Sequence, residues 1–468
     1  MMVPMRMIVG AAMAALLALP AVAQSPRPDQ AQYRDIFKEL VEINTTLASG
    51  SCTLAAEKMA ARLRSAGYPA SDLHLIVTPA NPKEGSLVAV LPGSDPKAKA
   101  VLVLAHLDVV EARREDWSRD PFRFIEEDGY FYGRGTADDK AQAAIWVDML
   151  ARFKKEGFKP RRTLKMALTC GEEGAPFNGA RHLMNDHRAL IDAEFALNEG
   201  GWGRMDESGK RIYVGINAGE KTPVNYRLEV TNPGGHSMRP VKDNAIYRLA
   251  AGLLKIGAHD FPVQTTDSSL GFFAKMGPEL GGAMGAAMTA FAKNRTDMQA
   301  AAIIAADPAF NAMLRTTCVT TLLDAGHANN ALPQRAGANV NCRIFPGGTP
   351  EQVGTQLSEL MDDPEIKVTT AKGRNAGGAA PPLTDAVMKP IIAAAARHWP
   401  GVPVVPMLEI GATDASYLTP AGIPTYGFTG IFFEPDGSRL HGLNERVRVR
   451  AVYEGRDLIT EVVRDYVK

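Results

Sequence analysis

Imidazole and carboxylate side chains directly follow several apolar runs of this chain, and this pattern limits the possible folds more than any other feature. The runs span residues 101–105, 164–169 and 194–198. The polar groups that follow them are His106, Asp108, Glu172, Glu173 and Glu199. Apolar runs of this length predict buried strands, and in open α/β sheets sites form beyond the carboxyl ends of the strands. We therefore expect these groups to converge on one site.

The residue types indicate a metal centre. Asp138 opens a predicted helix and His441 lies near the end of the chain. Two neutral imidazoles and three of these carboxylates would be a suitable ligand set for two zinc ions, with one bridging carboxylate and a water as nucleophile. A lone residue of these types is more often a cap or a surface charge, so the prediction rests on their combination.

The adjacent glutamates Glu172 and Glu173 cannot play the same role, because neighbours on an extended or tightly turning backbone point in different directions. One of them is expected to ligate metal while the other faces the water as the general base. Asp108 lies two residues beyond His106 on an extended segment, so its carboxylate returns to the same face. It can then accept the N–H of the metal-bound imidazole and orient the ring.

Six short strings occur in order along the chain and carry a family resemblance. They span residues 105–110, 133–140, 171–174, 198–201, 234–237 and 440–445. Together they resemble the dinuclear zinc exopeptidase and deacylase family that includes aminoacylase, carnosinase, glutamate carboxypeptidase, acetylornithine deacetylase and succinyl-diaminopimelate desuccinylase. Within that family the long run 261–315 is most similar to the carboxypeptidase S-like branch. The resemblance covers nearly the whole mature chain.

The resemblance implies a role for each group, carried over motif by motif. The implied ligands of one zinc are His106, Asp138 and Glu199. Those of the other zinc are Asp138, Glu173 and His441, so that Asp138 is the bridge. Glu172 would then be the general base. Two Zn²⁺ per chain are expected, one of which another divalent metal could replace.

Three further residues are candidates for holding the substrate. Hydrolysis of an amide needs a donor to the developing oxyanion, and His236, in a glycine-flanked turn, is one candidate, with a turn histidine lacking a partner as the alternative. The resemblance implies that this histidine reaches the active site of the other subunit of a homodimer. Arg343 offers a planar fork for a substrate carboxylate and Asn330 a donor to the amide, at positions similar to the family's substrate-binding positions. A surface salt bridge is the alternative for Arg343, and the loop 411–414 resembles one near the substrate terminus.

The first 23 residues predict a secretory signal peptide, with one early positive charge, a short apolar core and small residues before Gln24. The core is too short for a membrane span. We therefore expect an exported protein, periplasmic or secreted. The formal net charge is zero and the charges are mixed in sign, which argues against nucleic acid or an anionic membrane surface as a partner.

The four cysteines show no Cys-x-x-Cys spacing, so they are poor metal ligands. An oxidising compartment permits a disulfide without requiring one. Cys318 and Cys342 lie on predicted strands of one small sheet and are the expected pair if a disulfide forms. Cys170 is interpreted as a buried small side chain beside the catalytic turn.

The predicted fold class is α/β: a zinc-exopeptidase-like catalytic domain with a mixed sheet flanked by helices, interrupted by an α+β domain that serves dimerisation or acts as a lid. The insert is expected to contain strand 225–231, helix 244–256, strands 318–324 and 336–344, helix 350–361 and strand 366–371, which is a βαββαβ order. The predicted boundaries are 1–23 for the signal peptide, 24–218 and 375–468 for the catalytic domain, and 219–374 for the insert. The Ala-, Gly- and Met-rich run 261–315 is predicted to pack as helices within the insert, with a hydrophobic substrate pocket as the alternative.

We therefore expect an exported, zinc-dependent, homodimeric exopeptidase or N-acyl amino acid hydrolase that cleaves an amide bond in small substrates with a free carboxylate. Glu172 would remove the water proton and deliver it to the leaving amine, and Arg343 would bind the substrate carboxylate. An enzyme acting on a non-peptide amide or carbamate would use the same groups. A non-catalytic binding protein of this fold is a further alternative, and retention of every proposed ligand counts against it.

Overall fold

The computed structural model describes residues 27–370 and 378–468 of the chain. The predicted signal peptide, residues 1–23, lies outside the described residues, as does Ala371 at the end of the last predicted strand of the insert. Across the described ranges no helix combines the length and the apolar character needed to span a bilayer.

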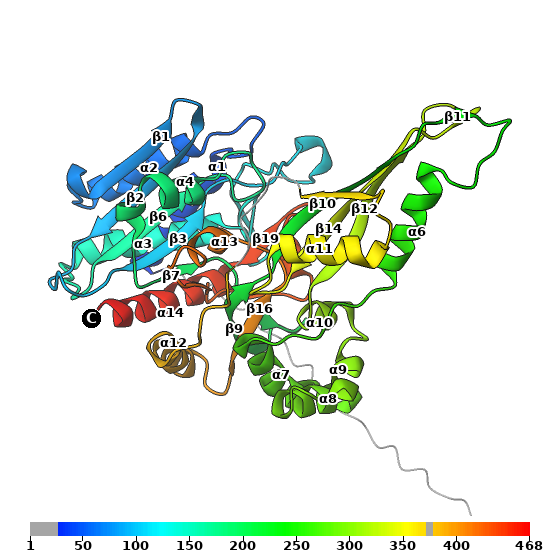
Figure 1. Ribbon diagram of the computed structural model, residues 1–468. Helices are drawn as coiled ribbons and strands as arrows, with labels where there is room; N and C mark the ends of the chain where they lie inside the picture. The colour runs from blue at the N-terminus through cyan, green and yellow to red at the C-terminus, as the bar shows by residue number, and fades with distance from the viewer. Residues whose placement is uncertain (1–26, 371–377) are drawn as a thin grey trace, which may run out of the picture.

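A mixed sheet of ten strands forms the larger of two units (Figure 1). Its order is β1 (Leu73–Thr78), β2 (Asn81–Leu91), β6 (Leu164–Thr169), β3 (Val101–His106), β7 (Phe195–Asn198), β17 (Thr425–Gly427), β9 (Arg211–Glu220), β8 (Gly203–Met205) and β18 (Phe432–Phe433), with β16 (Val404–Glu409) paired to β9. The central neighbours β6, β3, β7 and β17 run parallel, whereas β1, β2 and β6 pair antiparallel. The predicted mixed sheet is confirmed.

Helices cover both faces of this sheet because its central strands are apolar on both sides. In β3 alternate residues enter different clusters, with Val101, Val103 and Ala105 in one and Leu102 and Leu104 in the other. The first cluster is shared with α1 (Pro28–Glu42), α2 (Cys52–Ser65), α3 (Lys140–Lys155), α12 (Asp385–His398) and α14 (Val449–Val467). The second is shared with α4 (Gly179–Asp186), α5 (Arg188–Ile191) and α13 (Ala415–Leu418). Such strands have continuous apolar sequences, which is why they are predictable.

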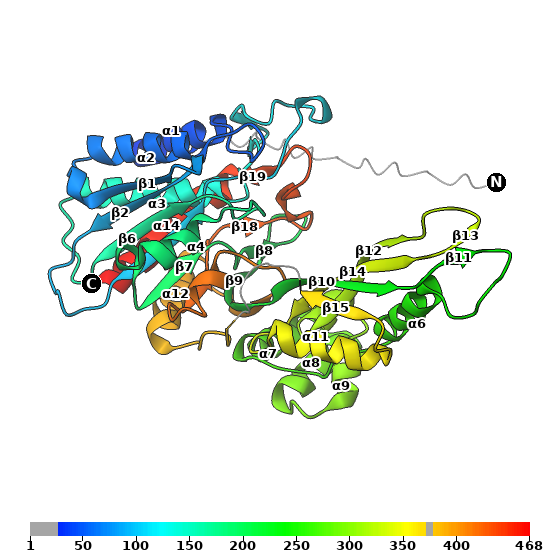
Figure 2. The same ribbon diagram turned by 45° about the horizontal axis from the view of Figure 1, so that its top comes forward.

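A second, four-stranded antiparallel sheet projects from the first (Figures 1 and 2). Its order is β12 (Thr317–Ala325), β14 (Arg335–Ile344), β10 (Thr222–Thr231) and β15 (Lys367–Thr370). In β10, residues 224, 226, 228 and 230 are buried, and α6 (Ala245–Gly257) and α11 (Pro350–Met361) pack on that face. The expected βαββαβ order is confirmed, while the domain boundaries at 218/219 and 374/375 stay a prediction.

The run 261–315 is helical, as predicted, but its apolar side chains lie against the large sheet. Its helices are α7 (Asp267–Leu280), α8 (Gly282–Lys293), α9 (Met298–Ile304) and α10 (Pro308–Ala312). Their apolar side chains, Phe272 and Phe273 among them, share a cluster with Val405 and Leu408 of β16 in the large sheet. The helices therefore pack on one another, as predicted, but their shared apolar side covers the large sheet and not the small sheet of the insert. Amphipathic spacing identifies a helix, but it does not say which neighbouring sheet the apolar face will cover.

Two disulfides join segments that are distant in the sequence. Cys318 and Cys342 face each other across β12 and β14 and are bonded, so the expected pair is confirmed. Cys170 is bonded to Cys52 at the start of α2. The interpretation of Cys170 as an unbonded small side chain was wrong. The two cysteines are 118 positions apart in the sequence, and only the packing of α2 on the large sheet brings them together.

Candidate functional site

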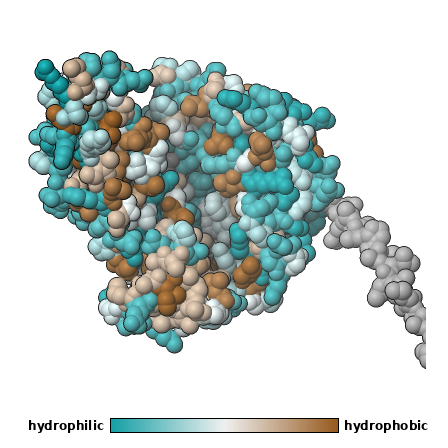
Figure 3. Space-filling view, turned by 90° about the vertical axis from the view of Figure 1, so that its right-hand side faces the viewer, coloured by the Kyte–Doolittle hydropathy of each residue, from teal (hydrophilic) through white to brown (hydrophobic). Residues whose placement is uncertain are grey.

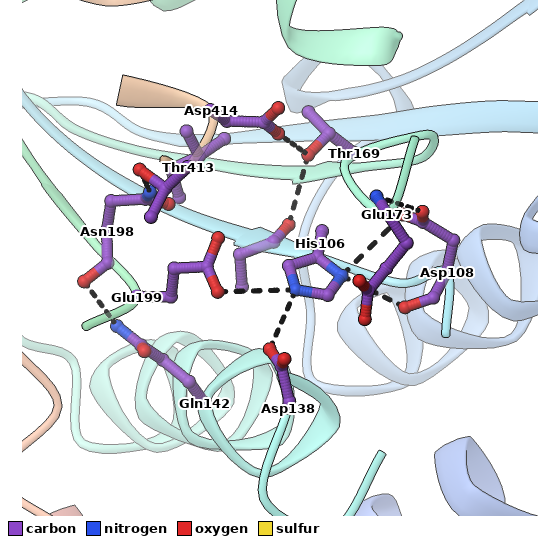
Figure 4. Close-up of polar contacts among 12 residues, drawn as sticks. His106, Asp108, Asp138, Gln142, Thr169, Glu173, Asn198, Glu199, Thr413 and Asp414 are labelled. Carbon is purple, nitrogen blue, oxygen red and sulfur yellow. Dashed lines mark hydrogen bonds and ion pairs between the residues drawn. The ribbon is translucent and has the colours of Figure 1, made fainter. Parts of the chain in front are cut away.

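Three of the candidate ligands, His106, Glu173 and Glu199, lie at or just beyond the carboxyl ends of parallel strands, and Figure 4 shows them together with Asp138, which lies just before α3. His106 ends β3, opposite Thr169 at the end of β6. Glu199 follows β7 directly, and the turn 170–174 follows β6. Because these strands run side by side in the same direction, groups more than 90 residues apart meet at one edge of the sheet.

The first set of ligands is buried and compact. His106 Nε2 lies 3.0 Å from Asp138 Oδ1 and 3.4 Å from Glu199 Oε2. All three side chains are largely shielded from solvent. Nδ1 of His106 lies 2.9 Å from the backbone carbonyl oxygen of Asp108, to which it can donate. That hydrogen bond would leave Nε2 unprotonated and directed at a metal.

The second set shares Asp138 with the first. His441 Nε2 lies 2.9 Å from Asp138 Oδ2 and 3.0 Å from Glu173 Oε1. The two oxygens of Asp138 therefore face different imidazoles, which is the arrangement of a bridging carboxylate. Two imidazoles and three carboxylates in this arrangement fit two divalent cations.

The carboxylates and imidazoles alter one another's protonation. Hydrogen bonds with Asp138 and Glu173 raise the pKa of His441 to about 10. Burial would raise the pKa of Asp138, yet its hydrogen bonds with His106 and His441 hold that pKa well below its usual range. Burial also raises the pKa of Glu199, and the Glu172 and Asp138 carboxylates raise it further. The site concentrates negative charge in a buried place, so cations that displace the protons would be stabilised there.

Glu172 and Glu173 diverge as expected. Glu173 faces His441, whereas Glu172 is buried, and its carboxylate raises the pKa of both Glu199 and Asp139. The turn depends on Gly171, whose φ is +90°. A Cβ atom at this position would lie only 2.1 Å from the carbonyl oxygen of Phe177. Only glycine fits this position without strain.

Asp108 acts differently from the expectation. Its carboxylate lies 3.6 Å from His106 Nδ1, too far for a strong hydrogen bond, and the ring meets its backbone carbonyl instead. Asp108 Oδ2 accepts a 3.0 Å hydrogen bond from the backbone N–H of Glu173. The carboxylate therefore holds the catalytic turn rather than the imidazole.

A buried ion pair that the sequence reasoning missed holds the two ligand loops together. Arg134 Nη1 donates to Glu445 Oε2 at 2.6 Å, and both side chains are buried. Glu445 Oε1 accepts from the backbone N–H groups of Ala137 and Asp138, and Arg134 Nη2 donates to the carbonyl of Gly442 at 3.1 Å. Both residues lie inside the quoted strings 133–140 and 440–445, so the motif itself was the available signal.

The place of the loop 411–414 beside the substrate terminus stays a prediction, and its Thr413 lines a pocket together with Glu199. Asp414 is buried and accepts hydrogen bonds from Thr169 Oγ1 at 2.9 Å and from Asn178 Nδ2 at 2.7 Å. Asn178 in turn donates to the carbonyl of Gly171. Asp414 therefore supports the catalytic turn from behind.

Two of the three candidate substrate-binding residues, His236 and Asn330, do not join the ligands within one chain. His236 and Asn330 lie together at the exposed tip formed by β11 (Gly235–His236) and β13 (Ala331–Leu332), far from the ends of β3 and β7 (Figures 1 and 2). Arg343 lies at the other end of the small sheet, opposite Pro223 and Thr317. It is thus the candidate on the insert that lies nearest the large sheet.

Comparisons with known proteins agree with this geometry. The family model described as peptidase family M20/M25/M40 matches residues 102–465. The human N-fatty-acyl-amino acid synthase/hydrolase PM20D1 is 27% identical over 390 residues, which cover 82% of this chain and 77% of the relative. Aminoacylase-1 of Sus scrofa is 25% identical, with 92% and 93% covered.

Solved structures have the same fold. The M20 family metallo-carboxypeptidase Sso-CP2 from Sulfolobus solfataricus superposes with a TM-score of 0.69 at 18% identity, covering 93% of this chain and 99% of that one. The family model spans the strands and loops that carry every candidate metal ligand. This chain therefore belongs to peptidase family M20/M25/M40, a family of metal-dependent hydrolytic enzymes.

Proposed function

We propose that this chain hydrolyses the amide bond of small N-acyl amino acids or peptides that bear a free carboxylate, with two zinc ions bound per chain. The observation that carries the proposal is the pair of ligand sets sharing Asp138, whose two oxygens face His106 and His441. The first zinc would be held by His106, Asp138 and Glu199 and the second by Asp138, Glu173 and His441.

The side chains around the ligands have separate tasks in this proposal. When bound, the ions supply Lewis acidity toward the amide carbonyl and activate the attacking water. Glu172 takes a proton from the water and delivers it to the leaving amine. Arg134 and Glu445 keep the loops of Asp138 and His441 in place, and Asp108 and Asp414 keep the turn of Glu172 in place.

The substrate class is supported by the relatives and by Arg343. One relative is named as an N-fatty-acyl-amino acid synthase/hydrolase, another as an aminoacylase, and a structural neighbour as a carboxypeptidase. A planar guanidinium recognises a free carboxylate with two parallel hydrogen bonds. Arg343 at the end of β14 nearest the large sheet is the group we assign to that carboxylate, with Asn330 as a further donor.

We also propose that two copies of the chain form the working enzyme. β12 is an edge strand, and its Leu322 and Leu323 are each 66% exposed. Leu254 of α6 is 76% exposed. Figure 3 shows the molecule from the right-hand side of Figure 1, the side on which α6 lies. A two-fold contact would cover these apolar side chains and could bring His236 to the partner's metal centre.

We also propose that the protein is exported from the cytoplasm. It is supported by the sequence of residues 1–23 and by the two disulfides, since disulfides persist in oxidising compartments.

The decisive experiment measures metal content and hydrolysis together. We expect about two zinc ions per purified chain, hydrolysis of N-acyl amino acids or dipeptides, loss of both with a strong chelator, and recovery with added zinc. A metal-free protein whose hydrolysis is insensitive to the chelator would contradict the proposal.

A further inference from the structure

A cavity of about 400 Å³ adjoins the metal centre. Its walls come from the segments 45–52, 80–84, 108–111 and 170–175, and they include Asp108 and Glu173. Every wall segment belongs to the unit of the large sheet, and none belongs to the four-stranded sheet. Arg343, which lies on the four-stranded sheet, is therefore not one of the wall residues.

The walls are suited to an alkyl chain. The apolar lining residues are Leu47, Ala80, Pro82, Val109, Val110 and Ala175, and the Cys52–Cys170 disulfide lies among them. The volume is within the range of small-molecule binding sites, which are typically about 300–1,000 Å³ and mostly apolar.

Most polar groups in the walls already have partners. Thr45 Oγ1 donates to the Leu107 carbonyl at 2.7 Å, and Glu111 accepts from the backbone N–H of Ala48 at 2.9 Å. Among the described wall residues, two buried carboxylate oxygens have no hydrogen-bond partner, Oε2 of Glu84 and Oδ1 of Asp108. Since the other oxygen of Asp108 accepts from the backbone N–H of Glu173, Glu84 is the wall group that can be replaced to distinguish two possible occupants, an aliphatic chain and a substrate amino group.

We infer that this cavity binds the aliphatic acyl group of an N-acyl amino acid. The inference rests on the proposed function, in which Arg343 binds the carboxylate on the amine side of the scissile amide. The acyl side then has to extend away from the four-stranded sheet, and the cavity beside Glu173 is the apolar space available there. The enzyme is accordingly selective for acyl chains of several carbons.

The first test is a chain-length series of one N-acyl amino acid, from acetyl through butanoyl and hexanoyl to octanoyl. Burial of each methylene should raise kcat/KM by about fourfold until the cavity is full. If short and long acyl chains are hydrolysed at equal kcat/KM, the inference is overturned. If none of these substrates or the dipeptides is hydrolysed by the zinc-loaded enzyme, the proposed function itself fails.

The second test fills the cavity from its rim. Ala80→Trp should lower kcat/KM for the octanoyl substrate at least about tenfold, the loss expected when two or more methylenes are excluded, and leave the acetyl substrate unchanged. The control is Ala286→Trp, in an exposed hollow on α8, which should affect neither. An equal loss for both substrates in Ala80→Trp would contradict the assignment.

The third test distinguishes the two occupants. Glu84→Leu should raise kcat/KM for the octanoyl substrate severalfold, because it replaces a carboxylate in an apolar wall. If wild type instead prefers dipeptides with a free amino group and Glu84→Leu abolishes that preference, the cavity binds an ammonium group and the acyl assignment is wrong.

Discussion

At the residue scale, the site depends on the different directions in which two adjacent glutamates point. Glu172 and Glu173 are adjacent, yet the turn that begins at Gly171 directs Glu173 to His441 and leaves Glu172 buried beside Glu199. The backbone N–H of Glu173 is fixed by Asp108. The turn thereby fixes the positions of the proposed metal ligand Glu173 and the proposed general base Glu172 relative to each other.

Substitution of the proposed base tests this division. Glu172→Gln keeps the size of the side chain but cannot accept a proton, so kcat should fall by about 10²–10⁴-fold while the zinc content stays the same. Steady-state kinetics and elemental analysis of the same preparation measure both. Glu173→Gln is the matched variant and should lose metal as well as activity; near-normal turnover of Glu172→Gln would mean that another group is the base.

Lys221 provides a pH-dependent prediction away from the metal centre. Burial, with a smaller effect of Arg343, lowers its pKa from 10.5 to about 7, although Nζ donates to the carbonyls of Ala312 and Arg315. Between pH 7 and 10.5 the unfolded chain therefore binds more protons at this position, so stability gains as pH rises through that window. Relative to Lys221→Met, wild type should gain in Tm from pH 7 to pH 9 in thermal unfolding; a constant difference would disprove the shift.

At the element scale, the catalytic turn is attached to its surroundings at both ends. Cys170 joins it to α2 through Cys52, and Asn178 holds the carbonyl of Gly171. The second disulfide, Cys318–Cys342, ties β12 to β14 and touches no part of the turn. The two disulfides therefore differ in their relation to the chemistry.

Removal of each disulfide separates stability from catalysis. Cys52→Ala/Cys170→Ala and Cys318→Ala/Cys342→Ala should each lower the free energy of unfolding, by about 3–5 kcal/mol for loops of these lengths. Only the first pair should also lower kcat at a temperature where both variants are folded, because only it frees the turn of Glu172. Chemical denaturation and initial rates measure these effects, and equal kcat for the two variants would contradict the positioning role.

At the scale of the whole molecule, the exposed tip that carries His236 is far from the metal ligands of its own chain (Figure 2). If the partner's site uses it, two inactive variants should complement each other. Mixing His236→Ala with Glu172→Ala chains makes about half the dimers mixed, each with one complete site, so activity should approach about a quarter of wild type. Labelled subunits report the exchange. A mixture that exchanges but stays inactive would rule out the shared site.

The sequence by itself determined the strands and the chemistry that follows them. The runs 101–105 and 164–169 are apolar because both faces of these strands are buried, and that continuity is visible without a structure. The ordered motifs likewise identified the family, and short-range spacing predicted the helix at 350–361.

Only the tertiary structure decided which distant groups meet. Cys52 reaches Cys170, Asp108 holds a backbone N–H instead of an imidazole, and the helices of 261–315 cover the large sheet instead of the small one. Periodicity records that a side chain is buried, but the partner that buries it is chosen by the packing of whole elements. The local sequence pattern therefore determines whether a segment forms a helix or a strand. The long-range packing of these elements determines the contacts that orient the proposed catalytic groups.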